Sequence, residues 1–295
     1  MVPLTRAMSG PSTTTTETAA AQPGLHAILK QLAANDRRER NAGVEEVAAL
    51  LSAEHCALSE LDLMKIWKGL YYTMWMTDRP RAQQAMAESL ANLVRVAQAS
   101  VVIPFIAAFW RTICRDWASI DVLRVDKFYL LMRMYVRAVF ERLAVMDWDV
   151  KMISRYADVL ATYPLSPRNS AVADAIRYHM IDIYLDELER VHHATTTSDT
   201  AAPASERPAA KKTAIPLHAL LSPFDVLART ALSKVVRKRA ADEVLRDPRL
   251  ALIWSYEPPE PTATVPPPPA PVVQSKKSSS SASTSSRPAK RARST

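Results

Sequence analysis

Residues 60–77, ELDLMKIWKGLYYTMWMT, decide the fold class of this 295-residue chain. Their apolar side chains recur at steps of three and four residues, which is the spacing of one face of an α-helix. That face comprises Leu63, Ile66, Trp67, Leu70 and Met74. Other large apolar residues widen it, so we expect this helix to be buried on more than one side. Lys65 and Lys68 lie on the remaining face.

The same period continues along most of the chain. In residues 121–145 an apolar stripe is accompanied by Arg133, Arg137 and Glu141, which step by four along another face. From such patterns we predict helices over 25–34, 37–51, 60–77, 80–98, 104–117, 121–145, 148–162, 168–192 and 223–247.

Capping residues and prolines indicate where several of these helices begin. Ser166-Pro167 and Ser222-Pro223 are interpreted as an N-cap followed by proline at the first helical position. Asp147 is placed to cap the next helix, and new helices are expected near Pro80 and Pro104.

The predicted helices define an all-α fold. From the third onward their centres are spaced by roughly 20–25 residues, so that a helix pair recurs at about the period of HEAT and armadillo repeats. We therefore predict a HEAT/armadillo-like helical-repeat stack. No repeat of sequence is visible, and an irregular helical bundle is the alternative.

Three segments lack the apolar surface needed to form a core. They are a leader (1–23), a flexible loop (194–213) and a Pro-rich, basic tail (257–295), and each is expected to be disordered or flexible. The helical-repeat domain then occupies residues 24–193, with the helices of 214–256 packing on the same domain.

The composition excludes several classes of protein. The chain has only 4 glycines against 21 prolines, and it contains neither of the common glycine-rich phosphate-binding loops. No apolar run is long enough for a transmembrane helix, and the N-terminus does not resemble a secretory signal. Two distant cysteines, Cys56 and Cys114, fit a reducing compartment such as the cytosol or nucleus.

No arrangement of side chains predicts catalysis. The histidines and cysteines lack metal-ligand spacing, and the adjacent His192 and His193 are interpreted as a solvated helix end. The acids between Asp182 and Glu189 are interpreted as a solvated face. We expect no enzyme activity, no metal, no cofactor, no small-molecule substrate and no membrane partner.

The net charge of +8 is concentrated in the tail, where residues 256–295 alone carry +4. Polyanions such as nucleic acid attract a chain of this kind. In the helical part the cluster of Lys234, Arg237, Lys238 and Arg239 predicts either a phosphate contact or simply a charged helix end that the macrodipole favours.

Aromatic residues cluster at the start of the fold, within 67–75. They could stack nucleic-acid bases, but their helical spacing matches the apolar stripe and favours core packing. Tyr72, beside Lys68, is the member most expected to be exposed.

The tail carries two basic clusters, Lys276-Lys277 and Lys290-Arg291-Ala292-Arg293, separated by twelve residues. This spacing is that of a bipartite nuclear localisation signal, which an import receptor reads as an extended chain. Basic tails are also common without that function.

Two long strings resemble the ribosomal RNA processing protein 1 family. The first is KIWKGLYY at 65–72, with Met74-Trp75-Met76, Asp78 and Pro80; the second runs from Phe109-Trp110-Arg111 through Trp117 to Leu131-Met132-Arg133. Two fainter blocks follow, IYLDEL at 183–188 and Pro223-Phe224 with Ala228-Arg229, so the similarity covers about residues 25–245.

The resemblance implies a non-enzymatic, helical assembly factor of the nucleolus that joins pre-ribosomal particles and supports processing of large-subunit ribosomal RNA precursors. A mildly basic stack could contact RNA phosphates or protein partners, although some cations must pair with Asp121, Asp126 or Glu141. The candidate contacts are Lys65, Lys68, Arg124, Lys127, Arg133, Arg137, Lys234, Arg237, Lys238 and Arg239. The alternative is a helical-repeat adaptor for proteins, unrelated to ribosomal RNA.

Overall fold

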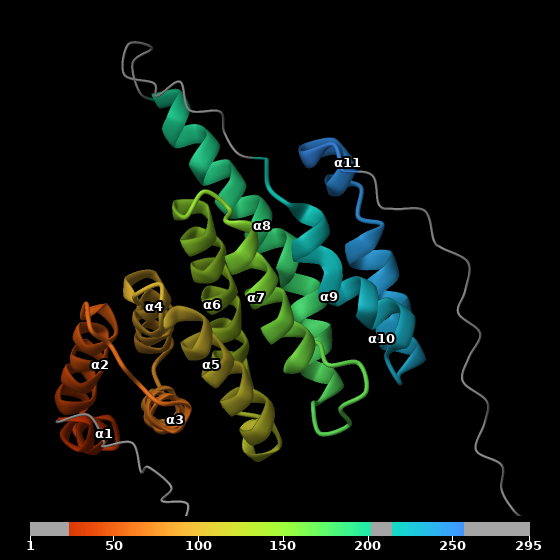
Figure 1. Ribbon diagram of the computed structural model, residues 1–295. Coiled ribbons are helices and arrows are strands. Elements are labelled where there is room, and N and C mark those ends of the chain that lie inside the picture. The colour runs from red at the N-terminus through yellow and green to blue at the C-terminus, as the bar shows by residue number, and fades with distance from the viewer. Residues whose placement is uncertain (1–23, 202–213, 257–295) are drawn as a thin grey trace, which may run out of the picture. The chain divides into compact units, whose positions relative to one another are not determined.

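The computed structural model describes residues 24–201 and 214–256, and every regular element in these two ranges is helical (Figure 1). The α-helices are α1 (Leu25–Leu32), α2 (Arg37–Ser52), α3 (Glu60–Trp75), α4 (Pro80–Val96), α5 (Val102–Asp116), α6 (Val125–Val145), α7 (Val150–Thr162), α8 (Asp174–Ala201), α9 (Leu217–Thr230), α10 (Lys234–Arg239) and α11 (Arg249–Trp254). A 3₁₀ turn, η1 (Trp117–Ser119), follows α5, and a π-helical turn, η2 (Ala240–Leu245), follows α10. The predicted all-α class is confirmed.

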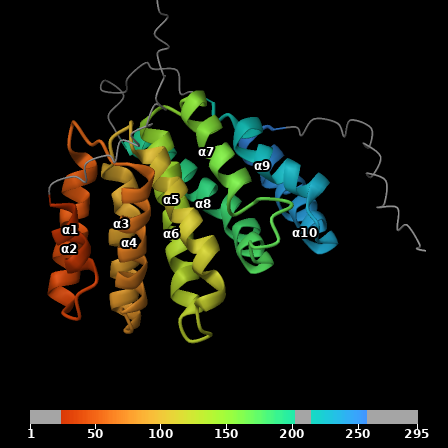
Figure 2. The same ribbon diagram turned by 60° about the horizontal axis from the view of Figure 1, so that its bottom comes forward.

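The helices form two layers. Each odd-numbered helix from α1 to α9 packs on the next odd-numbered one, and α2, α4, α6 and α8 pack on one another in the same order, ending at η2 (Figures 1 and 2). A helix therefore buries its apolar face against the helix two places along the chain as well as against the other layer. This is the arrangement of an α-solenoid, and it confirms the helical-repeat stack.

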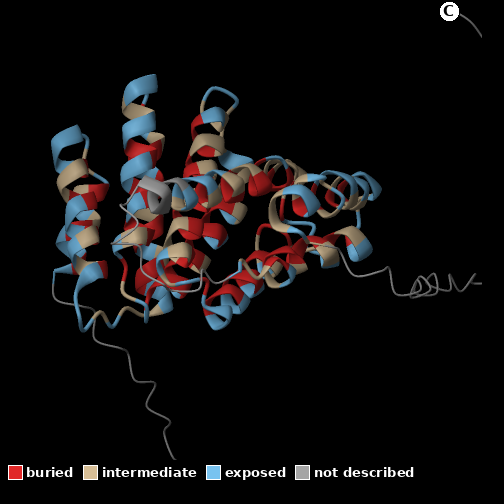
Figure 3. Ribbon diagram, turned by 90° about the horizontal axis from the view of Figure 1, so that it is seen from above, coloured by how far each residue is buried: buried red, intermediate tan, exposed pale blue. Residues whose placement is uncertain are grey.

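Buried residues, red in Figure 3, lie along the helices of both layers, and many of them are aromatic. Trp67 of α3 is buried against Phe105 and Phe109 of α5 and Tyr135 of α6, with ring centroids 4.8–5.4 Å apart. The Trp67 indole N–H donates to the Phe105 carbonyl at 2.9 Å, so this buried polar group is satisfied. The predicted apolar face of 60–77 is thus the core face of α3.

Short polar side chains fix several helix starts. The Asp36, Ser59, Asp149 and Ser233 side chains each accept from a backbone N–H in the first turn of the helix that follows. Pro80 is the first residue of α4, as predicted.

Asp147 does not cap the helix after it, contrary to the sequence prediction. Asp149 holds that position, while Asp147 and Trp148 adopt left-handed backbone conformations, with φ of 52° and 56°. Such angles are unfavourable for residues with a side chain. They are stabilised here by burial of the Trp148 side chain and by a 2.8 Å hydrogen bond from its N–H to the Leu143 carbonyl.

Pro223 lies inside α9 rather than at its start, so the single helix predicted over 223–247 is wrong. Proline has no N–H to donate to the carbonyl four residues back, here that of Ala219. The Ser222 hydroxyl donates to that carbonyl at 2.9 Å instead, and the helix continues through the proline. The chain then leaves α9 at Thr230 and restarts at Lys234.

The helix predicted to start at Ser166-Pro167 begins at Asp174. The buried Arg177 side chain stabilises an irregular loop in between, because it donates to the carbonyls of Ser166, Asn169 and Val172 at 2.6–3.2 Å. The helix then extends to Ala201, into the predicted flexible loop, of which 202–213 lies outside the described residues. None of the helices described is both long enough and apolar enough to cross a bilayer.

Gly69 of α3 lies directly against Leu32 of α1. A Cβ atom at this position would lie 2.8 Å from Leu32 Cδ1 and 3.0 Å from Leu32 Cβ. The Thr73 hydroxyl, one turn along, donates to the Leu32 carbonyl at 3.1 Å. Glycine is therefore required here for packing rather than for backbone freedom.

We predict that Gly69→Val lowers the free energy of unfolding by about 1–3 kcal/mol, because the added side chain overpacks this contact. Urea denaturation followed by circular dichroism measures the change. Ala85→Val, at an exposed position of α4, is the control and should change stability by only about 0.5 kcal/mol. Equal effects of the two substitutions would contradict the close contact.

Candidate functional site

Lys127 is a structural residue, and the prediction of a surface contact for it is wrong. Its side chain is 1% exposed, and its ammonium group donates to the carbonyls of Trp75 and Thr77 at 2.6 and 2.8 Å. Burial lowers the pKa of Lys127, and the charge of Asp78, 3.7 Å away, opposes this shift. The side chain joins the end of α3 to the start of α6.

Arg133 and Arg137 lie on one face of α6, as predicted, but that face meets α8. Their Nε atoms both contact the carboxylate of Glu187 at 2.5 Å, and the Glu187 side chain has no exposed surface. Arg133 also contacts Asp186, which pairs in turn with Arg249 of α11. The acids of α8 were predicted to form a solvated face. Instead, most of them take part in an ionic cluster that joins α8 to other helices.

Two of the four cations predicted near α10 are also engaged within the fold. Arg237 donates to the carbonyls of Ala231 and Leu232 just after α9. Arg239 pairs with Glu243 at 2.7 Å and with Asp182 of α8 at 2.6 Å.

Three other candidates are partly exposed but have carboxylate partners. Lys65 pairs with Asp62 at 3.5 Å, Lys68 with Asp116 at 2.9 Å and Arg124 with Asp121. Asp121 is one of the three acids expected from the sequence to pair with some of the cations, and its partner is Arg124. Exposed pairs of this kind contribute little to stability, so these cations could exchange partners.

The aromatic cluster is mainly core, as predicted. Trp67 and Tyr71 are buried and Trp75 is partly buried, whereas Tyr72 is 45% exposed with the Lys68 ammonium 4.9 Å from its ring centroid.

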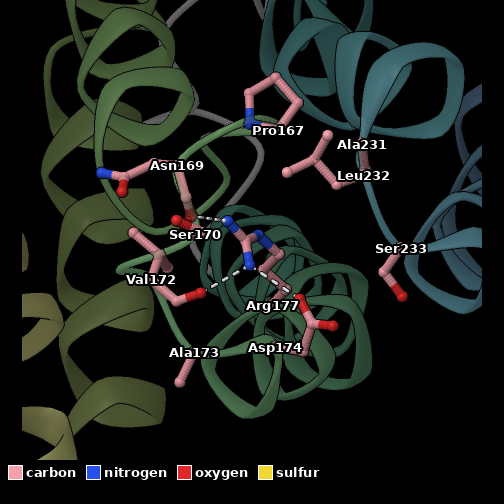
Figure 4. Close-up of a pocket in the computed structure, with 10 residues that line it drawn as sticks. All are labelled: Pro167, Asn169, Ser170, Val172, Ala173, Asp174, Arg177, Ala231, Leu232 and Ser233. Carbon is pink, nitrogen blue, oxygen red and sulfur yellow. Dashed lines mark hydrogen bonds and ion pairs between the residues drawn. The ribbon is translucent and has the colours of Figure 1, made fainter. Parts of the chain in front are cut away.

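Lys234 and Lys238 differ from the other candidates. Both side chains are exposed, and neither has an ion pair with any residue of the described part of the chain. Lys234 directly follows Ser233, which lines a hollow of about 340 Å³ where the loop before α8 meets the turn between α9 and α10 (Figure 4).

The two charged residues that line the hollow, Asp174 and Arg177, pair with each other. Its buried cation, Arg177, points into the loop, where its donors are taken by backbone carbonyls and by Asp174 at 2.7 Å (Figure 4). Arg168, in the same loop, is exposed and was missed as a candidate. Arg168 follows Ser166-Pro167, which was interpreted as a helix start, so the sequence gives no sign of a binding residue. Only the folded chain brings its loop next to the start of α10.

The partly buried Cys114 thiol is not an activated nucleophile. Burial raises the pKa of the Cys114 thiol to about 12, which is the opposite of what an activated nucleophile needs. Within 24–201 and 214–256, no three His, Cys, Asp or Glu residues gather as metal ligands. The residues of the predicted import signal, Lys276, Lys277, Lys290, Arg291 and Arg293, lie outside the described residues.

The fold and its surfaces define a helical-repeat protein with charged outer faces. The sequence matches the family model described as "Nucleolar protein, Nop52" over residues 25–289. The chain belongs to the Nop52 family, and the resemblance to ribosomal RNA processing protein 1 is confirmed by its relatives.

Those relatives are named ribosomal RNA processing protein 1 homologs. Homolog B of Homo sapiens is 37% identical over 177 residues, which is 58% of this chain and 23% of the relative. Homolog A of Homo sapiens is 33% identical over 177 residues, 58% of this chain and 38% of the relative. The Drosophila melanogaster homolog is 32% identical over 181 residues, 58% of this chain and 25% of its own length. The matched region thus spans well under half of each relative.

We predict that Glu187→Gln lowers the free energy of unfolding by about 3 kcal/mol or more, because Arg133 and Arg137 lose their shared buried charge. Chemical denaturation measures the change. Glu88→Gln, which removes an exposed partner of Arg95, should alter stability by less than about 0.5 kcal/mol. A mild effect at Glu187 would mean that the cluster does not brace α6 against α8.

Proposed function

We propose that this chain is a non-enzymatic scaffold of the nucleolus that binds precursors of the large ribosomal subunit and supports processing of their RNA. The Nop52 family match over residues 25–289 carries the proposal, together with relatives whose names state a role in ribosomal RNA processing. This family match does not favour the alternative of a protein adaptor unrelated to ribosomal RNA.

The geometry supports docking rather than catalysis. A two-layer stack buries the inner faces of its helices and leaves the outer faces as extended surfaces. The partners we propose are proteins of the pre-ribosomal particle and the precursor RNA itself. Of the candidate contacts, Lys65, Lys68, Arg124, Arg133, Lys234 and Lys238 have side chains that a partner can reach.

Nuclear entry is proposed to depend on the basic tail, through Lys276, Lys277, Lys290, Arg291 and Arg293. An import receptor would bind these side chains in acidic pockets, which requires that both clusters keep their charge.

We predict that depletion of the protein causes precursors of large-subunit ribosomal RNA to accumulate, as measured by northern blot, while small-subunit precursors stay near their normal level. The tagged chain should co-purify with assembly factors of the large subunit, identified by mass spectrometry. Unchanged precursor levels together with absence of such factors would refute the proposed function.

We also predict that replacing Lys290, Arg291 and Arg293 with alanine shifts a fluorescently tagged chain out of the nucleus. Lysine at all three positions is the control that preserves charge, and it should keep the nuclear signal. Nuclear accumulation of the alanine variant would show that the tail is not the import signal.

A further inference from the structure

The corner between α9 and α10 carries cations that the fold does not use. Lys234 and Lys238 are exposed, and so is Arg168 of the loop before α8. None of the three forms an ion pair with a residue of 24–201 or 214–256. Most other arginines of the stack reach a carboxylate or a backbone carbonyl. Arg37, Arg38 and Arg81, at the other end of the stack, are exposed and form no ion pair within these ranges either, so they serve as a comparison.

The fold brings these cations together from two distant segments. The Leu232 N–H donates to the Pro167 carbonyl at 3.1 Å, which fixes the α9–α10 turn against the loop. Arg168 directly follows Pro167, and Lys234 directly follows Ser233 at the edge of the hollow (Figure 4). Lys238 is one helical turn further along α10, on the same face as Lys234.

The charge at this corner is uncompensated. The one carboxylate that lines the hollow, Asp174, is occupied by Arg177 at 2.7 Å. Arg237, between the two lysines, points inward to the carbonyls of Ala231 and Leu232. Like charges four residues apart on a helix are mildly destabilising, so the proximity of Lys234 and Lys238 does not itself stabilise α10.

We infer that this corner, formed by Arg168, Lys234 and Lys238, is a binding site for the phosphodiester backbone of single-stranded RNA. Three exposed cations on these two adjoining segments can neutralise phosphates of one strand and release their counterions. Asn169, Ser170 and Ser233 line the hollow and offer further donors to phosphate or ribose oxygens. This inference rests on the proposed function and deepens it, because it assigns the precursor RNA a direct contact.

The test measures binding of a fluorescein-labelled single-stranded oligoribonucleotide by anisotropy at several salt concentrations. The full chain is used with all six cations of the tail, Lys276, Lys277, Arg287, Lys290, Arg291 and Arg293, replaced by glutamine, so that the tail adds no positive charge. In this background the corner variant is R168Q/K234Q/K238Q. The matched control is R37Q/R38Q/R81Q, which removes three exposed cations from the other end of the stack.

The corner variant should bind at least about tenfold more weakly, and the slope of log Kd against log salt should fall in magnitude by about 2, as expected for three lost phosphate contacts. The control should retain the parent affinity, and circular dichroism should show equal helicity for all variants. Ultraviolet crosslinking should place the RNA on peptides that contain residues 166–173 and 231–239.

Three outcomes would overturn the site: equal loss in both variants, no RNA binding by the parent, or corner-dependent binding of poly-glutamate in preference to RNA. The last would assign the corner to an acidic protein segment. The proposed function has a separate readout, because the corner variant can lose RNA affinity in vitro while the chain still co-purifies with large-subunit precursors. Failure of co-purification with intact RNA binding would refute the scaffold role alone.

Discussion

The stack depends on the packing of the Trp67 side chain between its two layers. This indole contacts rings of α5 and α6 and donates its N–H to the Phe105 carbonyl, so one side chain fixes three helices. A single helical hairpin could not bury so large a surface, and each repeat therefore needs its neighbours. This packing buries the inner faces of the helices. Only the outer faces and the loops remain accessible to a binding partner.

Charged side chains form a second set of connections, and they explain why the basic residues of the sequence overstate the binding surface. Glu187 holds Arg133 and Arg137 across the contact of α6 with α8, and Arg249 extends the cluster to α11. Lys127 joins α3 to α6 through backbone carbonyls. Such groups lose their hydration on burial, and hydrogen bonds within the protein replace it. Removing one partner leaves the other buried and unpaired, so it lowers the stability by more than the pair's net contribution.

The sequence was sufficient to predict helices wherever the period of 3.6 residues runs unbroken, as in 60–77 and 121–145. The prediction of helix starts failed at Pro167 and Pro223. At Pro167 the Arg177 side chain binds loop carbonyls, and at Pro223 the Ser222 hydroxyl binds a carbonyl of the same helix. A proline after serine is compatible both with a helix start and with a helix interior, and nothing in the local pattern separates the two. Side-chain hydrogen bonds to backbone carbonyls, within α9 at Pro223 and from Arg177 at Pro167, decide between them.

The same limit applies to the surface. A stripe of arginines on one helix predicts a basic face. Its carboxylate partners, however, lie on another helix some fifty residues away in the sequence, as Glu187 does for Arg137. Conversely, Arg168 has no basic neighbours in sequence and joins Lys234 only because the Leu232 N–H reaches the Pro167 carbonyl. Charge that the fold leaves unpaired, rather than charge density along the chain, is therefore the better guide to a binding surface. By that criterion the α9–α10 corner stands out over the α6 face, although the α6 face looks the more basic of the two in the sequence.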